Sequence, residues 1–217
     1  MRLIDLSQPL FAGCPNCPVH PPVRVDLVST HERDGWQVEM LSLTCHSGSH
    51  VDAPLHKVAG GASISEIPLE RFAGKAVIAD LRSSKPRQEI DSALLKKLLP
   101  KELNDRIVLL ATGWGDRRAR SEEWFYQSPR LSPDGARWLV QNKIRGVGID
   151  HYTVGGSDEP DNATVHEILL GGNVWILEEL KFPPVAFDVK QPAMFFALPI
   201  NLKGQSGSFC RPVIVIE

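Results

Sequence analysis

Long apolar runs and clusters of basic residues are absent from this sequence. No apolar stretch approaches the ~20 residues that a membrane-crossing helix needs, so we expect no membrane partner. The 24 basic and 26 acidic residues leave a net charge of −2, and the lack of basic runs argues against nucleic acid as a partner. The first six residues, Met1–Leu6, contain an acid at Asp5 and no hydrophobic signal region, which predicts a cytoplasmic protein.

Cysteine is also scarce, at four residues. Cys14 and Cys17 have the CxxC spacing of a redox or zinc-binding pair, but a structural zinc site needs a second pair. The prolines around them, including Pro15 and Pro18, favour an irregular loop over the helix of a thioredoxin-type motif. We therefore expect no redox or metal role for this pair, and we expect Cys45 to be a small buried residue.

Histidine, in contrast, is concentrated in one stretch, because three of the seven histidines fall within His46–His56 (His-Ser-Gly-Ser-His-Val-Asp-Ala-Pro-Leu-His). Divalent transition metals bind imidazole and carboxylate groups that converge on one point, and His46, His50 and Asp52 could supply three of them. The Ser-Gly-Ser segment and Pro54 disfavour a helix, so a loop after a strand is expected. The alternative is a set of ordinary surface histidines.

Apolar periodicity predicts a single mixed α/β domain over residues 1–217, without repeats or linkers. Strands are expected at 23–27, 36–44, 74–81, 106–112, 145–150, 174–177, 194–200 and 213–216. Helices are expected at 91–99, at 132–142 and from Asn162 or Thr164 to Leu170. Alternation at 23–27 indicates a half-buried strand, whereas the continuous apolar run at 106–112 indicates a central strand buried on both faces.

Two distant residues are candidates to complete a metal site. A metal with three protein ligands keeps a position for water, and a two-metal site needs further ligands from elsewhere in the chain. His166 lies early in a predicted helix, and Glu178 ends the apolar strand Val-Trp-Ile-Leu. Taken alone, each residue could equally be a packing residue or a surface residue without a ligand role.

The histidine stretch reads His-x-Gly-Ser-His-x-Asp-x-Pro-x-His, and it resembles the signature HxGTHxDxPxH of the cyclase-like metal-dependent hydrolases. This family includes bacterial kynurenine formamidases and isatin hydrolases. The resemblance covers nearly the whole chain. The other segments that match in order and spacing are Asp5–Leu10, Thr112–Trp114, Val147–Asp150 and His166–Leu180.

The resemblance implies a swivelling β/β/α fold and a centre of two divalent ions, with zinc as the first expectation and manganese as the second. The positions that match metal ligands are His46, His50, Asp52, His166 and Glu178. Asp52 matches a ligand placed to bridge the two ions, and His56 matches a histidine that moves protons beside them. Family members assemble as dimers or tetramers with active sites near subunit interfaces, so a homodimer or homotetramer is expected.

The function implied by the resemblance is arylformamidase-type hydrolysis of an N-formyl arylamine or related small amide, as in tryptophan catabolism. Metal-activated water is the simplest nucleophile, because no GxSxG motif is present, and His56 would carry the proton. The alternatives are hydrolysis of a cyclic amide or lactone as in isatin hydrolases, a cyclase or dehydratase, and a non-catalytic metal-binding protein.

Three departures from the family pattern concern mainly the substrate pocket. Ser49 replaces the threonine of the signature and keeps its hydroxyl. Cys17 stands where formamidases commonly have a tryptophan near the substrate, and His151–Val154 differs from their Ser-x-Asp pattern. The metal ligands are therefore better supported than an aryl pocket.

Overall fold

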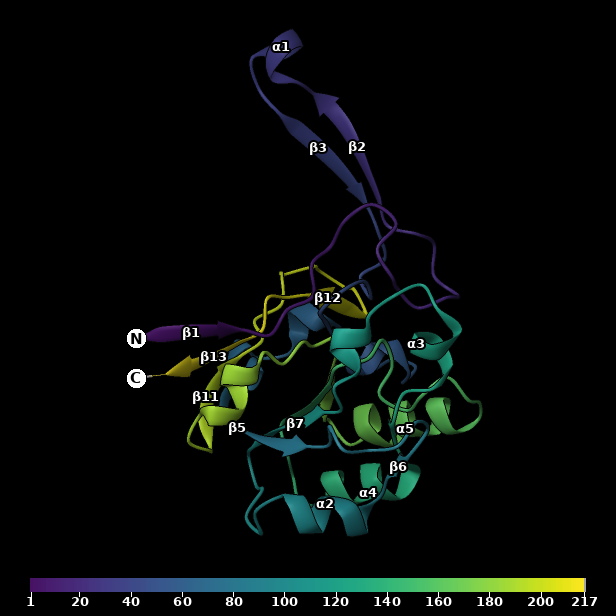
Figure 1. The fold of residues 1–217 in the computed structure, drawn as a ribbon, viewed down its shortest axis with the longest axis vertical. Helices are drawn as coiled ribbons and strands as arrows, with labels where there is room; N and C mark the ends of the chain where they lie inside the picture. The colour runs from purple at the N-terminus through teal and green to yellow at the C-terminus, as the bar shows by residue number, and fades with distance from the viewer. Residues whose placement is uncertain (217) are drawn as a thin grey trace.

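A nine-stranded mixed sheet forms the centre of the computed structural model, which describes residues 1–216 (Figure 1). The last residue of the predicted 1–217 domain lies outside this described part. The strands in their order across the sheet are β1 (Arg2–Asp5), β13 (Val213–Ile216), β11 (Ala193–Phe196), β5 (Ala73–Asp80), β7 (Ile107–Ala111), β9 (Gly146–Ile149), β10 (Trp175–Glu178), β4 (His50–Asp52) and β12 (Gly207–Phe209). Strands β5, β7, β9 and β10 are parallel, and the other pairs are antiparallel. The predicted mixed α/β fold is confirmed.

Two apolar cores lie on the two faces of this sheet, and β7 contributes to both. Val108 and Leu110 belong to the core beneath the helices, whereas Ile107 and Leu109 belong to the core on the opposite face. The helices on the first face are α2 (Ser92–Leu98), α4 (Pro133–Gln141) and α5 (Asp161–Gly171) (Figure 1). The central strand predicted at 106–112 is therefore buried on both faces, as expected from its continuous apolar run.

Helix α5 starts slightly earlier than its predicted caps. It begins at Asp161, directly after Pro160. Asn162 does not cap the helix, because its Oδ1 accepts a hydrogen bond from Thr153 Oγ1 at 2.6 Å. Thr164 instead donates back to the carbonyl of Pro160 at 2.9 Å. Neither side chain therefore caps the helix: Asn162 contacts a residue that precedes the helix, and Thr164 contacts the carbonyl just before its first residue.

Several elements are too short to show an apolar period, and the sequence did not predict them. The short helices and strands are α1 (His31–Asp34), α3 (Glu122–Tyr126), β6 (Glu89–Ile90) and β8 (Arg130–Leu131). The single-turn 3-10 helices are η1 (Pro54–His56), η2 (Ile64–Glu66), η3 (Leu69–Phe72), η4 (Trp114–Arg117) and η5 (Pro184–Asp188). Across the described residues, none of the helices is long and apolar enough to cross a bilayer.

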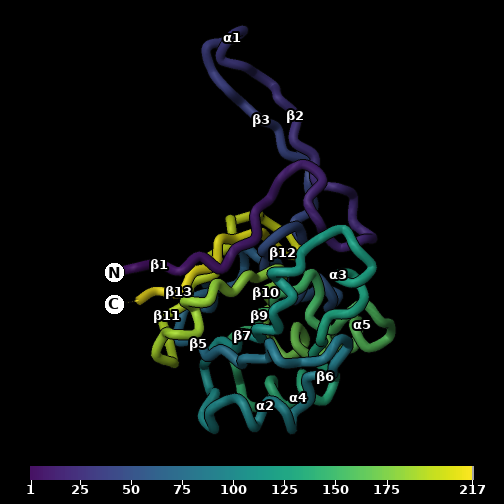
Figure 2. The backbone as a smooth tube through the Cα atoms, viewed as in Figure 1, coloured from purple at the N-terminus to yellow at the C-terminus, as the bar shows by residue number. Residues whose placement is uncertain are grey.

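Strands β2 (Arg24–Ser29) and β3 (Val38–Ser42) form an antiparallel hairpin that projects from the body (Figures 1 and 2). We call residues 24–42 the arm. Its exposed apolar side chains are Val25, Leu27, Val28, Trp36, Val38, Met40 and Leu41. The strand predicted at 23–27 is present as β2, but the predicted half burial is wrong, because β2 packs on no part of the nine-stranded sheet and both of its faces are open.

Candidate metal centre

Strand β4, which is next to the edge strand β12, places two of the predicted ligands in the sheet. It pairs with β10 on one side and with β12 on the other, and its register sets His50 opposite Glu178. Because successive strand residues point to opposite faces, His50 and Asp52 share one face. Val51 points to the other face, where it is part of the apolar core. The pairing of β4 with β10 therefore joins the histidine loop to Glu178.

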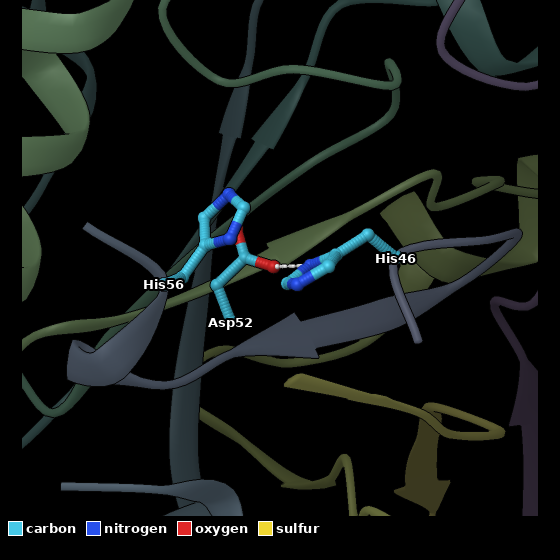
Figure 3. A group of neighbouring side chains, drawn as sticks. All are labelled: His46, Asp52 and His56. Atoms are coloured by element: carbon cyan, nitrogen blue, oxygen red, sulfur yellow. Dashed lines mark hydrogen bonds and ion pairs between the residues drawn. The ribbon is translucent and has the colours of Figure 1, made fainter. Parts of the chain in front are cut away.

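Asp52 lies at the centre of the cluster. Its Oδ1 is 2.7 Å from His46 Nδ1 and 3.3 Å from His50 Nε2, and its Oδ2 is 3.8 Å from His166 Nε2. Figure 3 shows His46 and His56 on either side of the Asp52 carboxylate, with the interaction to His46 drawn as a dashed line. A Cβ at Gly207 of β12 would lie 2.6 Å from the His46 ring, so a glycine leaves the room that this ring needs.

Glu178 closes the other side of the cluster. Its Oε2 is 3.6 Å from His50 Nε2, and its Oε1 is 3.4 Å from His166 Nε2. His56 is a partly exposed residue whose ring lies beside the cluster, with its centroid 4.0 Å from that of His46 and 5.8 Å from that of His166. The structure thus brings together all five predicted ligands and the predicted proton carrier.

Hydrogen bonds to the backbone fix the orientation of these side chains. His50 Nδ1 donates to the carbonyl of Gly48 at 2.7 Å, and His166 Nδ1 donates to the carbonyl of Asn162 at 2.9 Å. A carbonyl only accepts, so both Nδ1 atoms carry a hydrogen, and the two Nε2 atoms face the carboxylates, where a proton or a cation can lie between them. The backbone N–H of Val154 donates to Glu178 Oε1 at 2.8 Å. Such outer contacts are what orient metal ligands in proteins.

The electrostatic potential of the cluster favours positive charge. Burial opposes ionisation of Asp52, but His50 and His46 hold its pKa well below the usual range. Burial also opposes a charge on the histidines, yet Asp52 raises the pKa of His46 to about 10, and Glu178 raises the pKa of His166 to about 9. The two carboxylates therefore attract protons strongly, and a cation at this position would replace those protons.

The donor set fits a divalent metal. Asp52 Oδ2 is buried and has no hydrogen-bond partner within residues 1–216, a costly state that a cation would relieve. Two groups of side chains have ligand atoms within 4.8 Å of one another and share Asp52, namely His46, Asp52 and His56, and His50, Asp52 and Glu178. His166 belongs to neither group, although it lies beside Glu178. Imidazole and carboxylate donors suit zinc and manganese.

The pKa of the His56 ring differs from that of a free histidine. Partial burial lowers its pKa to about 4, with a further contribution from the nearby His46 and His166. The ordinary value is about 6.5, which is the value that the sequence alone suggests. In the metal-free protein the ring is therefore neutral at pH 7.

A cavity of about 360 Å³ opens onto the cluster. It is also lined by Cys17 and His20 from the N-terminal loop, which we define as residues 8–22, and by Tyr126 and Tyr152 from the body. The sequence indicated a position near the substrate for Cys17, because this residue departs from the family pattern there. It gave no sign of His20, a single histidine in a proline-rich segment, because nothing in the local spacing links it to the cluster.

Comparisons with known proteins agree with this geometry. A family model described as "Putative cyclase" matches residues 4–155. Kynurenine formamidases of Bacillus cereus (strain ATCC 14579) and Bacillus mycoides (strain KBAB4) are each 28% identical over 214 residues, covering 97% of this chain and 96% of each relative.

Solved structures share the fold. Isatin hydrolase A from Labrenzia aggregata has a TM-score of 0.84 at 24% identity, over 100% of this chain and 94% of that chain. Isatin hydrolase A from Ralstonia solanacearum has a TM-score of 0.86 at 22% identity, over 100% and 92%. A potential metal-dependent hydrolase with cyclase activity has a TM-score of 0.78 at 25% identity, over 98% and 96%.

Proposed function

The chain belongs to the putative cyclase family, and we propose that it is a metal-dependent hydrolase that cleaves a small amide, of the arylformamidase type. The observation that carries this proposal is the convergence of five histidine and carboxylate side chains, four of which line a cavity of about 360 Å³ while Asp52 is buried among them. Similarity to kynurenine formamidases over nearly the whole chain supports an N-formyl arylamine as the substrate.

His46, His50 and Asp52 would hold one ion in this proposal, and His166 and Glu178 would hold a second ion together with Asp52. Zinc is the first expectation and manganese the second. A divalent cation supplies two things in such a site, a lower pKa for water and polarisation of the substrate carbonyl. The protein supplies the orientation, through the backbone contacts of His50 and His166.

His56 is the proton carrier in this proposal. The residue is partly exposed, and its ring lies between the rings of His46 and His166, so it borders both halves of the ligand set. From this position it can take a proton from the attacking nucleophile and return it to the leaving nitrogen. General acid–base catalysis of this kind contributes roughly 10²–10⁴-fold to a rate.

The test is hydrolysis of N-formylkynurenine and isatin, side by side, after chelation and after adding back zinc or manganese. We expect chelation to abolish formamide hydrolysis and metal to restore it. Hydrolysis of isatin alone would replace the formamide with a cyclic amide as the substrate. Bound metal without turnover of either compound would contradict the proposed substrate class.

We also propose that the partner of this chain is a second copy of itself, in a homodimer or a homotetramer. An isolated two-stranded hairpin is marginally stable in water, and the arm exposes apolar side chains on both faces. The arm connects the N-terminal loop to the histidine loop, so whatever covers it lies near the site. Exposed apolar side chains near the cavity, among them Val19 and Tyr126, offer the matching surface on the other copy.

A further inference from the structure

Part of the N-terminal loop lines two different cavities. Cys17, Pro18 and His20 line the main cavity, and they also line a second cavity of about 260 Å³. The second cavity is closed on its other side by Arg120 and Phe125. The three shared residues border space on two sides, so polar contacts elsewhere in the loop contribute to holding them in position.

Gln8 and Asn16 of the loop donate to Ser49 Oγ and Ser47 Oγ, and arginine side chains supply further contacts by donating to carbonyls of the loop. Arg118 donates to the carbonyl of Pro9 at 2.9 Å and to the carbonyl of Pro15 at 2.7 Å. Arg120 donates to the carbonyl of Gly13 at 3.0 Å. Arg118 is the buried member of the pair, with its side chain 6% exposed. One guanidinium thus spans the loop from Pro9 to Pro15, which is two residues before Cys17.

The same guanidinium also reaches the strand end that carries a candidate metal ligand. Arg118 Nη2 is 2.7 Å from Glu179 Oε2, and the Glu179 side chain is 1% exposed. Glu179 directly follows Glu178, and its backbone is itself fixed, because its N–H donates to the carbonyl of His151 and its carbonyl accepts from Ser49 Oγ at 2.6 Å. Arg118 therefore connects the N-terminal loop to Glu179 beside the metal centre, in addition to the contacts of Gln8 and Asn16 with the histidine loop.

We propose that Arg118 is a positioning residue that sets the distance between the N-terminal loop and the metal centre, and thereby the affinity for substrate. A guanidinium presents five N–H donors in a rigid plane, so it can hold two carbonyls and a carboxylate in fixed relative positions. A lysine has the same charge without this geometry. The kinetic part of the proposal rests on the proposed function, whereas the structural part does not.

Hydrogen–deuterium exchange at pH 8 tests the structural part. Arg118→Met alone would leave Glu179 buried without its partner, so the informative variant is the double substitution Arg118→Met with Glu179→Gln. We expect faster exchange of backbone amides at residues 9–17 in the double variant, and a much smaller change in Glu179→Gln, which keeps the carbonyl contacts. Arg211→Met is the matched control, because Arg211 pairs with Asp5 on the exposed surface. Unchanged exchange at residues 9–17 in the double variant would overturn the proposal.

Steady-state kinetics and metal content test the functional part. We expect KM to rise about tenfold or more in the double variant, with kcat changed by less than about threefold, because displacement of a binding wall weakens positioning. The metal content of the double variant should equal that of the wild type. The single variant Arg118→Lys should also have a raised KM, because lysine keeps the charge without the planar geometry. Equal losses in kcat and metal content would instead show disruption of the centre. If no substrate is found, the exchange data still decide the role of Arg118.

Discussion

Asp52 is shared by both halves of the candidate centre. Comparing an Asp52 variant with a His56 variant distinguishes a metal ligand from a proton carrier. Asp52→Asn should lose most of the bound metal, because the amide lacks the charge that both groups of donors share. His56→Ala should keep its metal and lose activity by about 10²–10⁴-fold, as expected for loss of a proton carrier. Elemental analysis and initial rates on the same preparations measure both effects. A His56→Ala enzyme with a near-normal rate would contradict its assignment.

Metal binding should release protons, because the carboxylates hold protons on the histidines of the metal-free site. The pKa values of about 10 for His46 and about 9 for His166 lie above neutral pH, so both rings carry a proton that a cation must displace. Competition with protons weakens as pH rises, so the apparent zinc affinity should increase from about pH 6 to about pH 8. Calorimetry in buffers of different ionisation enthalpy measures the released protons. A pH-independent affinity would disagree with this electrostatic description.

At the residue scale, the sequence could predict those site residues that lie close together in the chain. The loop from His46 to His56 concentrates its ligands locally, so spacing alone indicated a metal site. His166 and Glu178 were weak candidates from their residue types alone and became firm ones only through family resemblance, because their approach to Asp52 depends on helix α5 and on the pairing of β4 with β10. The contact of Arg118 with Glu179 has no local signal at all, since the two residues are distant in sequence.

At the element scale, the close packing of β9 against β10 requires a residue without a side chain at Gly146. A Cβ at this position would overlap the indole of Trp175, which lies opposite it in the sheet. Gly146→Ala should therefore lower the free energy of unfolding by about 1–3 kcal/mol. Urea denaturation of the metal-free protein measures this change.

Gly171→Ala is the matched control for Gly146→Ala. Gly171 ends helix α5, and a Cβ there would have no neighbour within 4 Å. Alanine favours the helix by up to about 1 kcal/mol, so this variant should be neutral or more stable. Equal losses in the two variants would contradict the packing argument.

At the element scale, the prediction was good where the apolar pattern is long and the element is covered by the same chain. Helices α2 and α4 and strand β7 fit this description, and their predicted positions agree with the structure to within about two residues. The alternation in β2 correctly indicated a strand and wrongly indicated burial, because a period of two shows two faces without showing what covers them. Strands β4 and β12, each three residues long, are below the length at which a period is visible.

At the scale of the whole molecule, we propose that two copies associate through the arm. Leu27 and Leu41 lie on one face of the hairpin, because Val25 is paired with Leu41 and is two residues from Leu27. Substituting both leucines with lysine should shift the protein from an oligomer to a monomer in light scattering. Far-UV circular dichroism should remain unchanged, since neither side chain packs on its own body.

Leu98→Lys provides the control for the arm substitution. Leu98 is also an exposed apolar residue, but it lies at the end of helix α2, away from the arm. The oligomeric state of this variant should equal that of the wild type. A wild-type protein that is monomeric at all concentrations would contradict the proposed self-association.

The pairing of β4 on both sides has a consequence for changes in chain length. Inserting or deleting one residue within β4 would turn Val51 toward the cavity and turn His50 or Asp52 toward the apolar core. Both neighbouring strands hold the backbone in place, so the segment has no free edge along which it could slide to recover. The turn around His31–Asp34 at the tip of the arm has no such constraint, because it is exposed and contacts no core. Among related sequences, length changes should therefore be frequent at the tip of the arm and absent from β4.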